Sequence, residues 1–139
     1  MIFVRKANES DEQAIFDLAS QLATSFVVER DAFTASFQEI LQRSEIYLPV
    51  AEISGCVIAY LLGYRQPTFY ANGPVAWAQE IVVAAEHRRR GVGKLLMRDF
   101  ERWAADQKCQ LVSLATRRAD QFYKALGYDE SATYYRKRL

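Results

Sequence analysis

The segment from residue 75 to residue 107 restricts the possible folds of this chain more than any other. A run of apolar and β-branched residues, 75–83, predicts a strand, and the short polar segment Glu86–Arg90 predicts a loop. From Gly91 onward the apolar residues recur at helical spacing, at Val92, Leu95, Leu96, Phe100, Trp103 and Ala104. A strand that passes through a tight loop into an amphipathic helix is typical of folds in which helices pack on a sheet.

The remaining patterns extend this strand and helix into a layered domain. Helices are predicted at 10–23, where Ser10 and Gln13 have the spacing of a capping box, at 30–43 and at 119–126, where Gly127 follows as a C-terminal cap. Strands are predicted at 2–5, 46–53, 56–64, 111–114 and 132–137, with a Ser54–Gly55 hairpin turn and a loop at 66–74. We expect one α/β (α+β) domain, 1–139, with a mixed, mostly antiparallel sheet of six to seven strands and about four helices.

Composition excludes several classes of protein. Half of the 139 residues are hydrophobic and the net charge is +1, which argues against disorder and against general attraction to nucleic acid or an anionic membrane. Two cysteines without CxxC spacing and a single histidine argue against a zinc site, so no metal is expected. The sequence shows neither a signal peptide nor an apolar run of membrane-spanning length, so the expected location is the cytoplasm.

The loop before the central helix has the chemistry of an anion site. The first N–H groups of a helix have no partner within it, and glycines at 91 and 93 allow a ligand to approach the backbone closely. Arg88, Arg89, Arg90 and Lys94 add positive charge. The alternative is an ordinary helix start with solvated arginines. The spacing fits neither a P-loop nor a dinucleotide fingerprint, since position 96 is leucine.

Two motifs resemble one known family. Arg88-x-x-Gly91-x-Gly93 resembles the acetyl-CoA signature of the GNAT acetyltransferases, and residues 119–128, with Phe122 and Tyr123, resemble a second segment of that superfamily. The resemblance covers nearly the whole chain and is densest from 76 to 128. It implies a GNAT-like sheet that is splayed at its central strands, between 75–83 and 111–114. The thioester of acetyl-CoA would enter that gap.

The resemblance also implies contacts with acetyl-CoA. The backbone at Ile81, Val82 and Val83 would pair with the pantetheine arm, and N–H groups across 89–94 would hold the pyrophosphate. Arg88 or Lys94 would reach the outer phosphates. The complete predicted set is Ile81, Val82, Val83, Arg88, Arg89, Arg90, Gly91, Val92, Gly93, Lys94 and Thr116. Thr116 stands where many members carry asparagine, so that contact departs from the family pattern.

Two residues are candidates for the chemistry of acetyl transfer. Tyr123 matches a family position that acts as general acid toward the CoA thiolate, and a phenol, with an ordinary pKa of about 10, is protonated at neutral pH. Its alternative role is packing against the CoA arm. Glu80 is an acid within an apolar run and matches a position where some members place a general base. Its alternative is a carboxylate paired with an arginine or facing solvent.

The acceptor is the least defined part of the prediction. The family takes acceptor contacts from the loop between the first two helices, here about Thr24–Phe33, and from the strand at 75–80, which gives Phe26, Glu29 and Trp77 as substrate-binding candidates. A small-molecule amine and a protein amine both stay open. The short C-terminal hairpin would leave either an uncovered cleft or an edge for homodimer contacts.

Two other classes of function compete with the enzyme. One is a CoA-binding regulatory domain without catalysis. The other is an RNA-binding module that uses Arg88–Arg90 together with Arg117 and Arg118, which the near-neutral charge disfavours.

Overall fold

A computed structural model describes residues 1–23 and 26–139. Thr24 and Ser25, at the start of the predicted acceptor loop, lie outside this description. The elements, in chain order, are β1 (Ile2–Lys6), the 3₁₀ turn η1 (Glu9–Asp11), α1 (Glu12–Leu22), α2 (Arg30–Gln42), β2 (Ile46–Tyr47), β3 (Pro49–Ile53), β4 (Cys56–Thr68), β5 (Gly73–Val83), the 3₁₀ turn η2 (Ala85–His87), α3 (Val92–Asp106), β6 (Val112–Leu114) and α4 (Asp120–Ala125).

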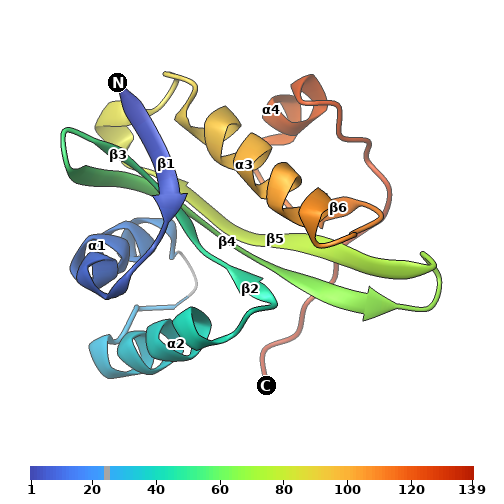
Figure 1. The fold of residues 1–139 in the computed structure, drawn as a ribbon, viewed down its shortest axis with the longest axis horizontal. Helices are drawn as coiled ribbons and strands as arrows, with labels where there is room; N and C mark the ends of the chain where they lie inside the picture. The colour runs from blue at the N-terminus through green and yellow to red at the C-terminus, as the bar shows by residue number, and fades with distance from the viewer. Residues whose placement is uncertain (24–25) are drawn as a thin grey trace.

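The strands form one six-stranded sheet in the order β1-β3-β4-β5-β6, with β2 paired to β4 (Figure 1). All pairs are antiparallel except β5 and β6, which run parallel. The β3–β4 hairpin turns at Ser54 and Gly55, both with positive φ, as a two-residue type I′ turn requires. The expected mixed, mostly antiparallel sheet is therefore confirmed.

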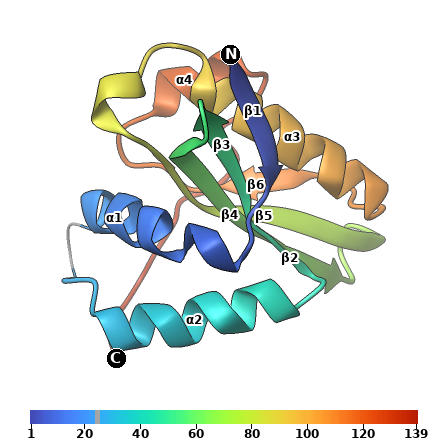
Figure 2. The ribbon, with the colours of Figure 1, turned by 60° about the vertical axis from the view of Figure 1, so that its left-hand side comes forward.

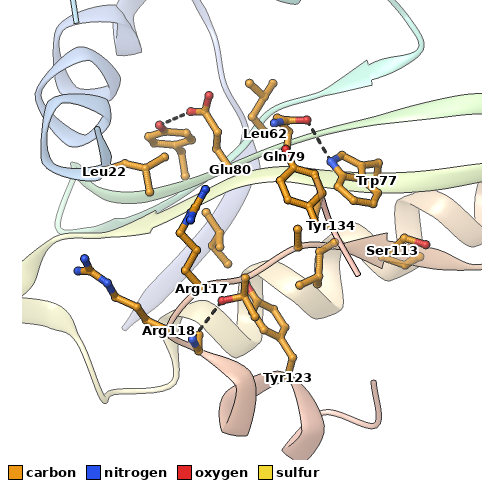
Figure 3. Close-up of a pocket in the computed structure, with 18 of the residues that line it drawn as sticks. Leu22, Leu62, Trp77, Gln79, Glu80, Ser113, Arg117, Arg118, Tyr123 and Tyr134 are labelled. Carbon is orange, nitrogen blue, oxygen red and sulfur yellow. Dashed lines mark hydrogen bonds between the residues drawn. The ribbon is translucent and has the colours of Figure 1, made fainter. Parts of the chain in front are cut away.

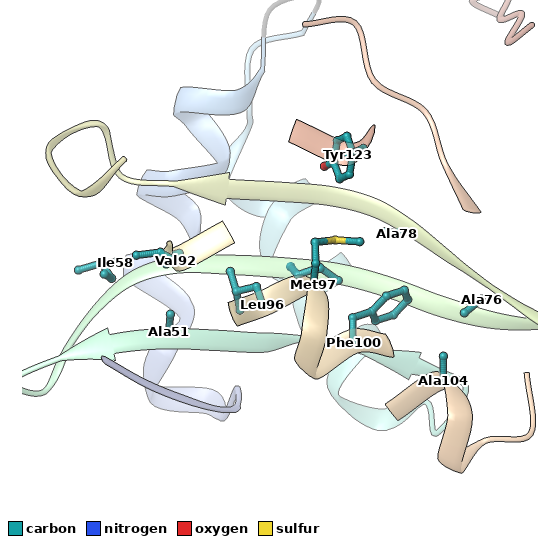
Figure 4. Packing of buried hydrophobic residues seen from close by; sticks show 12 residues of the cluster. Ala51, Ile58, Ala76, Ala78, Val92, Leu96, Met97, Phe100, Ala104 and Tyr123 are labelled. Atoms are coloured by element: carbon teal, nitrogen blue, oxygen red, sulfur yellow. The ribbon is translucent and has the colours of Figure 1, made fainter. Parts of the chain in front are cut away.

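Helices cover both faces of the sheet. α1 and α2 pack on one face, and α3 and α4 lie on the other (Figures 1 and 2). The amphipathic pattern from residue 91 is borne out, because Leu96, Met97 and Phe100 point from α3 into the core, where they are fully buried (Figure 4). A Cβ at Gly63 of β4 would collide with the Phe100 ring, so the absence of a side chain there lets α3 lie close to the sheet.

A β-bulge in β5 changes which side chains face the site. Leu62 of β4 pairs with Glu80, whereas the next residue, Gly63, pairs with Ala78, so Gln79 is the extra residue. Strict alternation would place Trp77 and Glu80 on opposite faces of the sheet. Because of the bulge, Ala76 and Ala78 face the α3 core while Glu80 and Val82 lie on the same face as Tyr60.

The sheet opens between β5 and β6. The two strands pair only from Ala76 with Val112 to Ala78 with Leu114, and β5 then continues to Val83. In the described chain, residues 79–83 thus have no partner on the β6 side. This separation is the splay that the family resemblance implied.

Several sequence expectations were wrong in detail. The strand predicted at 132–137 is absent, and residues 129–139 form an exposed tail without helix or strand. The predicted loop at 66–74 is mostly strand, since β4 and β5 extend to a turn at 69–72. The capping box forms between Asn8 and Asp11 instead of Ser10 and Gln13. No helix in 1–23 or 26–139 combines the length and apolarity that crossing a membrane requires.

Candidate active site

The loop before α3 has a backbone suited to an anion. Arg89 and Gly91 both adopt the left-handed conformation, with φ of 64° and 79°. Where left-handed and right-handed backbone conformations alternate along the chain, successive N–H groups point toward the same side. The N–H groups at the start of α3, in Val92, Gly93 and Lys94, have no partner within the helix. This arrangement can bind phosphate oxygens by backbone hydrogen bonds.

The two glycines have different surroundings. A Cβ at Gly91 would meet no atom within 4 Å, so the space beside it is open to a ligand. A Cβ at Gly93 would lie 3.3 Å from Cζ of Phe122 in α4, so Gly93 allows close helix packing. The Arg88 Nε donates to the Val83 carbonyl at 3.1 Å and fixes the loop to the end of β5. Arg89, Arg90 and Lys94 are exposed.

The free edge of β5 leads from this loop toward the sheet opening. The side chains of Ile81 and Val83 pack against the α3 core and Val82 is buried on the opposite face, so these apolar residues can hydrogen bond a ligand only through their backbone groups. Thr116 lies across the opening, and its hydroxyl oxygen accepts the Ala119 N–H at 3.0 Å. This bond leaves the Thr116 O–H available as a donor.

A long cleft begins at the sheet opening and reaches the α1–α2 side of the molecule (Figure 3). Its lining includes seven of the predicted site residues: Phe26, Glu29, Trp77, Glu80, Ile81, Thr116 and Tyr123. Residues 88–94 of the loop before α3, and the side chains of Val82 and Val83, do not line it. The structure therefore collects the catalytic and acceptor candidates in one cleft, with the loop 88–94 outside it.

Tyr123 reaches the cleft from α4. The residue is 8% exposed and its ring makes edge contacts with Phe122 and Tyr128, at centroid distances of 4.9 and 5.9 Å. Burial raises the pKa of the Tyr123 hydroxyl above its ordinary value. The phenol is consequently a proton donor, and not an anion, at neutral pH.

Glu80 faces the cleft from β5 and is half-buried. The Tyr60 hydroxyl, on the neighbouring strand β4, donates to Glu80 Oε1 at 2.7 Å (Figure 3). Tyr60 is 1% exposed, and burial, followed by the facing carboxylate, raises the pKa of Tyr60. The tyrosine therefore acts as a fixed donor that holds one carboxylate oxygen and leaves the other toward the cleft.

The acceptor candidates lie at two places along the cleft. Trp77 lies on β5, where its Nε1 donates to Gln79 Oε1 at 3.0 Å and its ring stacks on Tyr134 of the tail at 6.5 Å. Phe26 and Glu29 precede α2 and are both exposed. The Arg138 guanidinium, also in the tail, lies 4.4 Å from the centre of the Phe26 ring.

Several residues that line the cleft were not predicted there, among them Tyr60 and Tyr134. Arg117 and Arg118 also line it, although the sequence suggested them only for the alternative of RNA binding. The side chain of Arg117 extends across the cleft toward the strand that carries Glu80 (Figure 3). A tyrosine inside an apolar strand could have marked Tyr60 as a buried hydroxyl that needs a partner. Its partner, Glu80, could not be predicted, because it depends on the register of β4 and β5. Within the described part of the chain, no three His, Cys, Asp or Glu side chains lie together as metal ligands.

Comparisons with known proteins define the class of this chain. The family model "Acetyltransferase (GNAT) family" matches residues 13–128. The chain therefore belongs to the GNAT acetyltransferase family, whose members use acetyl-CoA, and the protein is an acyltransferase.

Individual relatives are more specific. Aminoglycoside N(6′)-acetyltransferase type 1 of Salmonella typhimurium is 30% identical over 118 residues, which are 78% of this chain and 81% of that protein. The structure of AAC(6′)-Iy in complex with the bisubstrate analogue CoA-S-monomethyl-acetylneamine superposes with a TM-score of 0.85 at 25% identity, and covers 100% of this chain and 99% of that chain. A transcriptional regulator from Bacillus halodurans has a TM-score of 0.91 at 19% identity over both complete chains, which shows the shared fold alone.

Proposed function

We propose that this enzyme transfers the acetyl group of acetyl-CoA to a primary amine of a small molecule. The observation that carries the proposal is the placement of Glu80 and Tyr123 on two sides of one cleft that begins where β5 and β6 separate. The acceptor class is supported by the relatives whose names specify aminoglycoside N-acetylation. A small acceptor also fits a cleft lined by aromatic and acidic side chains.

The residues present fit acetyl-CoA. The open space beside Gly91 and the left-handed backbone at Arg89 and Gly91 suit a pyrophosphate, which backbone N–H groups from 89 to 94 would hold. Lys94 is exposed and available for outer phosphates, whereas Arg88 is partly engaged with Val83. The edge at 81–83 has no strand partner on the β6 side, and its backbone groups other than the Val83 carbonyl, which accepts from Arg88, can hydrogen bond the amides of the pantetheine arm, as an added strand would.

Glu80 and Tyr123 divide the proton transfers. Glu80, held by Tyr60, accepts a proton from the attacking nitrogen, directly or through water, while a C–N bond forms at the thioester carbonyl. The C–S bond then breaks, and the Tyr123 hydroxyl gives its proton to the departing sulfur. Glu80 then releases its proton to solvent and Tyr123 regains one from solvent, so the products are the acetylated amine and CoA thiol.

Single substitutions test these two roles. Tyr123→Phe and Glu80→Gln keep the side-chain shape and remove the transferable proton or the base, and general acid–base groups contribute about 10²- to 10⁴-fold. We expect losses of that order in kcat, measured as CoA release, with acetyl-CoA affinity nearly unchanged by calorimetry. Glu86→Gln, an exposed glutamate in η2 that does not line the cleft, is the matched control. Wild-type turnover in both active-site variants would refute the mechanism, and no turnover of any amine by the wild type would refute the function.

A further inference from the structure

The C-terminal tail crosses the acceptor end of the cleft. From α4 the chain passes the edge of the sheet and ends on the side of α1 and α2 (Figures 1 and 2). Residues 132–136 line the cleft, and every side chain from 129 to 139 is exposed. A segment without helix or strand, and with little buried surface, has a low free energy of local opening. The tail therefore covers the cleft without being an integral part of the fold.

Two aromatic contacts join this tail to the acceptor side. Tyr134 stacks on Trp77, with ring centroids 6.5 Å apart and planes 24° apart. The Arg138 guanidinium lies over the face of Phe26 at 4.4 Å. The second contact is a cation–π interaction between a fixed positive charge and an aromatic ring on the predicted acceptor loop.

The Phe26 ring is consequently a site that already binds a cation. A ring that attracts a guanidinium through its negative face will attract an ammonium group in the same way. Glu29, three residues further on, adds a carboxylate to the same wall of the cleft. An acceptor with several amines would place one nitrogen at the thioester and still carry charges elsewhere on the molecule.

We propose that Phe26 forms a subsite for a second, non-reacting cationic group of a polyamine acceptor, and that Arg138 of the tail competes for it. The inference rests on the proposed function, since it assigns the acceptor class of the same cleft. The tail is an internal occupant that a polycationic acceptor displaces and a monoamine does not. It makes the enzyme selective for amines with at least two well-separated positive charges.

The strength of the cation–π contact sets how much Arg138 weakens binding of the acceptor. An exposed cation–π interaction contributes about 0.5–1 kcal/mol, which corresponds to roughly two- to fivefold in binding. Arg138→Ala should therefore tighten binding of the triamine spermidine by about two- to fivefold in calorimetry, and lower its KM by the same factor. Lys137→Ala removes a neighbouring charge that makes no ring contact and is the matched control. Removal of residues 132–139 should act in the same direction as Arg138→Ala, since it also removes Tyr134 from Trp77.

Phe26→Leu tests the subsite itself. It keeps an apolar side chain and removes the ring face, so the KM for spermidine should rise by a larger factor than the KM for butylamine. Weaker spermidine binding in Arg138→Ala, or equal effects of Arg138→Ala and Lys137→Ala, would overturn the competition. Absence of spermidine binding in all variants would overturn the subsite. Acetylation of butylamine but not spermidine would leave the proposed function intact and reject this inference.

Discussion

Tyr60 connects the core to the candidate site through one hydroxyl group. Its ring packs among buried residues between the sheet and α1, while its O–H reaches the Glu80 carboxylate. A buried hydroxyl needs a partner, and the partner here is the proposed base. In the proposed mechanism, the position of the Glu80 carboxylate thus depends on Tyr60, a residue that does not itself transfer a proton.

Tyr60→Phe is expected to slow turnover without disturbing acetyl-CoA binding. Phenylalanine keeps the ring packing, and the loss of the 2.7 Å hydrogen bond lets the carboxylate move from its position beside the amine. We expect a loss of roughly 10- to 100-fold in kcat, by analogy with the 1.5–3 kcal/mol of hydrogen bonds to charged groups. The substitution should have little further effect in a Glu80→Gln background. Equal losses in both backgrounds would show that Tyr60 acts independently of Glu80.

At the residue scale, the sequence predicted types of chemistry better than partnerships. Glu80 stands out as an acid within an apolar run and the two glycines as a helix start open to a ligand, whereas Tyr123 was proposed only through the family resemblance. The pairing of Tyr60 with Glu80 could not be predicted, since it depends on the register of β4 and β5 and on the bulge at Gln79. A bulge has no fixed sequence signature in this strand.

At the element scale, the turn η1 joins β1 to α1 through a charge cluster. The buried Asp11 carboxylate accepts hydrogen bonds from Arg5 at 2.8 and 2.9 Å and from the Asn8 N–H at 2.8 Å. Arg5 also bridges to Glu52 of β3 at 3.2 Å. The hydrogen bonds from Arg5, above all, hold the pKa of Asp11 below its usual range. One carboxylate thus fixes the first strand and the first helix relative to each other.

The lowered pKa of Asp11 predicts a loss of stability in acid. A carboxyl group whose pKa is lower in the folded than in the unfolded chain stabilises the fold above its unfolded pKa, about 3.9. That stabilisation disappears as pH falls through the folded pKa. We expect the free energy of unfolding, from urea titrations, to drop between about pH 5 and 2 more steeply in the wild type than in Asp11→Asn. Asp17→Asn, on the exposed face of α1, is the control. Parallel pH dependences of wild type and Asp11→Asn would contradict the assignment.

The sequence predicted best those elements in which apolar residues recur at regular spacing. α3 has a continuous apolar stripe and a glycine start, and its bounds are close to the expected ones. The prediction of a strand at 132–137 was wrong. Thr133, Tyr134 and Tyr135 favour strands, but a strand also requires a neighbouring strand edge to pair with. Intrinsic preference therefore misled the prediction where tertiary pairing was missing.

At the scale of the whole molecule, the opening of the sheet is what distinguishes this fold from a closed α/β layer. β6 pairs with β5 over three residues and then diverges, so the cleft begins where β5 has a free edge, and that edge leads to the loop 88–94. The sequence implied this arrangement only through its family resemblance. Periodicity alone could not show it, because each strand has the same pattern whether or not its neighbour separates.

Binding of acetyl-CoA along this opening should stabilise the entire fold. The cofactor would contact the free edge of β5, the loop 88–94 and α4, which belong to distant parts of the sequence. A ligand at 100 times its dissociation constant adds about 2.7 kcal/mol, which corresponds to a rise in Tm of roughly 10 °C for a domain of this size. Scanning calorimetry with increasing acetyl-CoA should show that rise. S-acetyl-pantetheine, which lacks the pyrophosphate and the nucleotide, should give a clearly smaller shift at the same concentration. An equal shift with both ligands would mean that the loop 88–94 does not hold the pyrophosphate, and no shift at saturating acetyl-CoA would exclude the opening as its site.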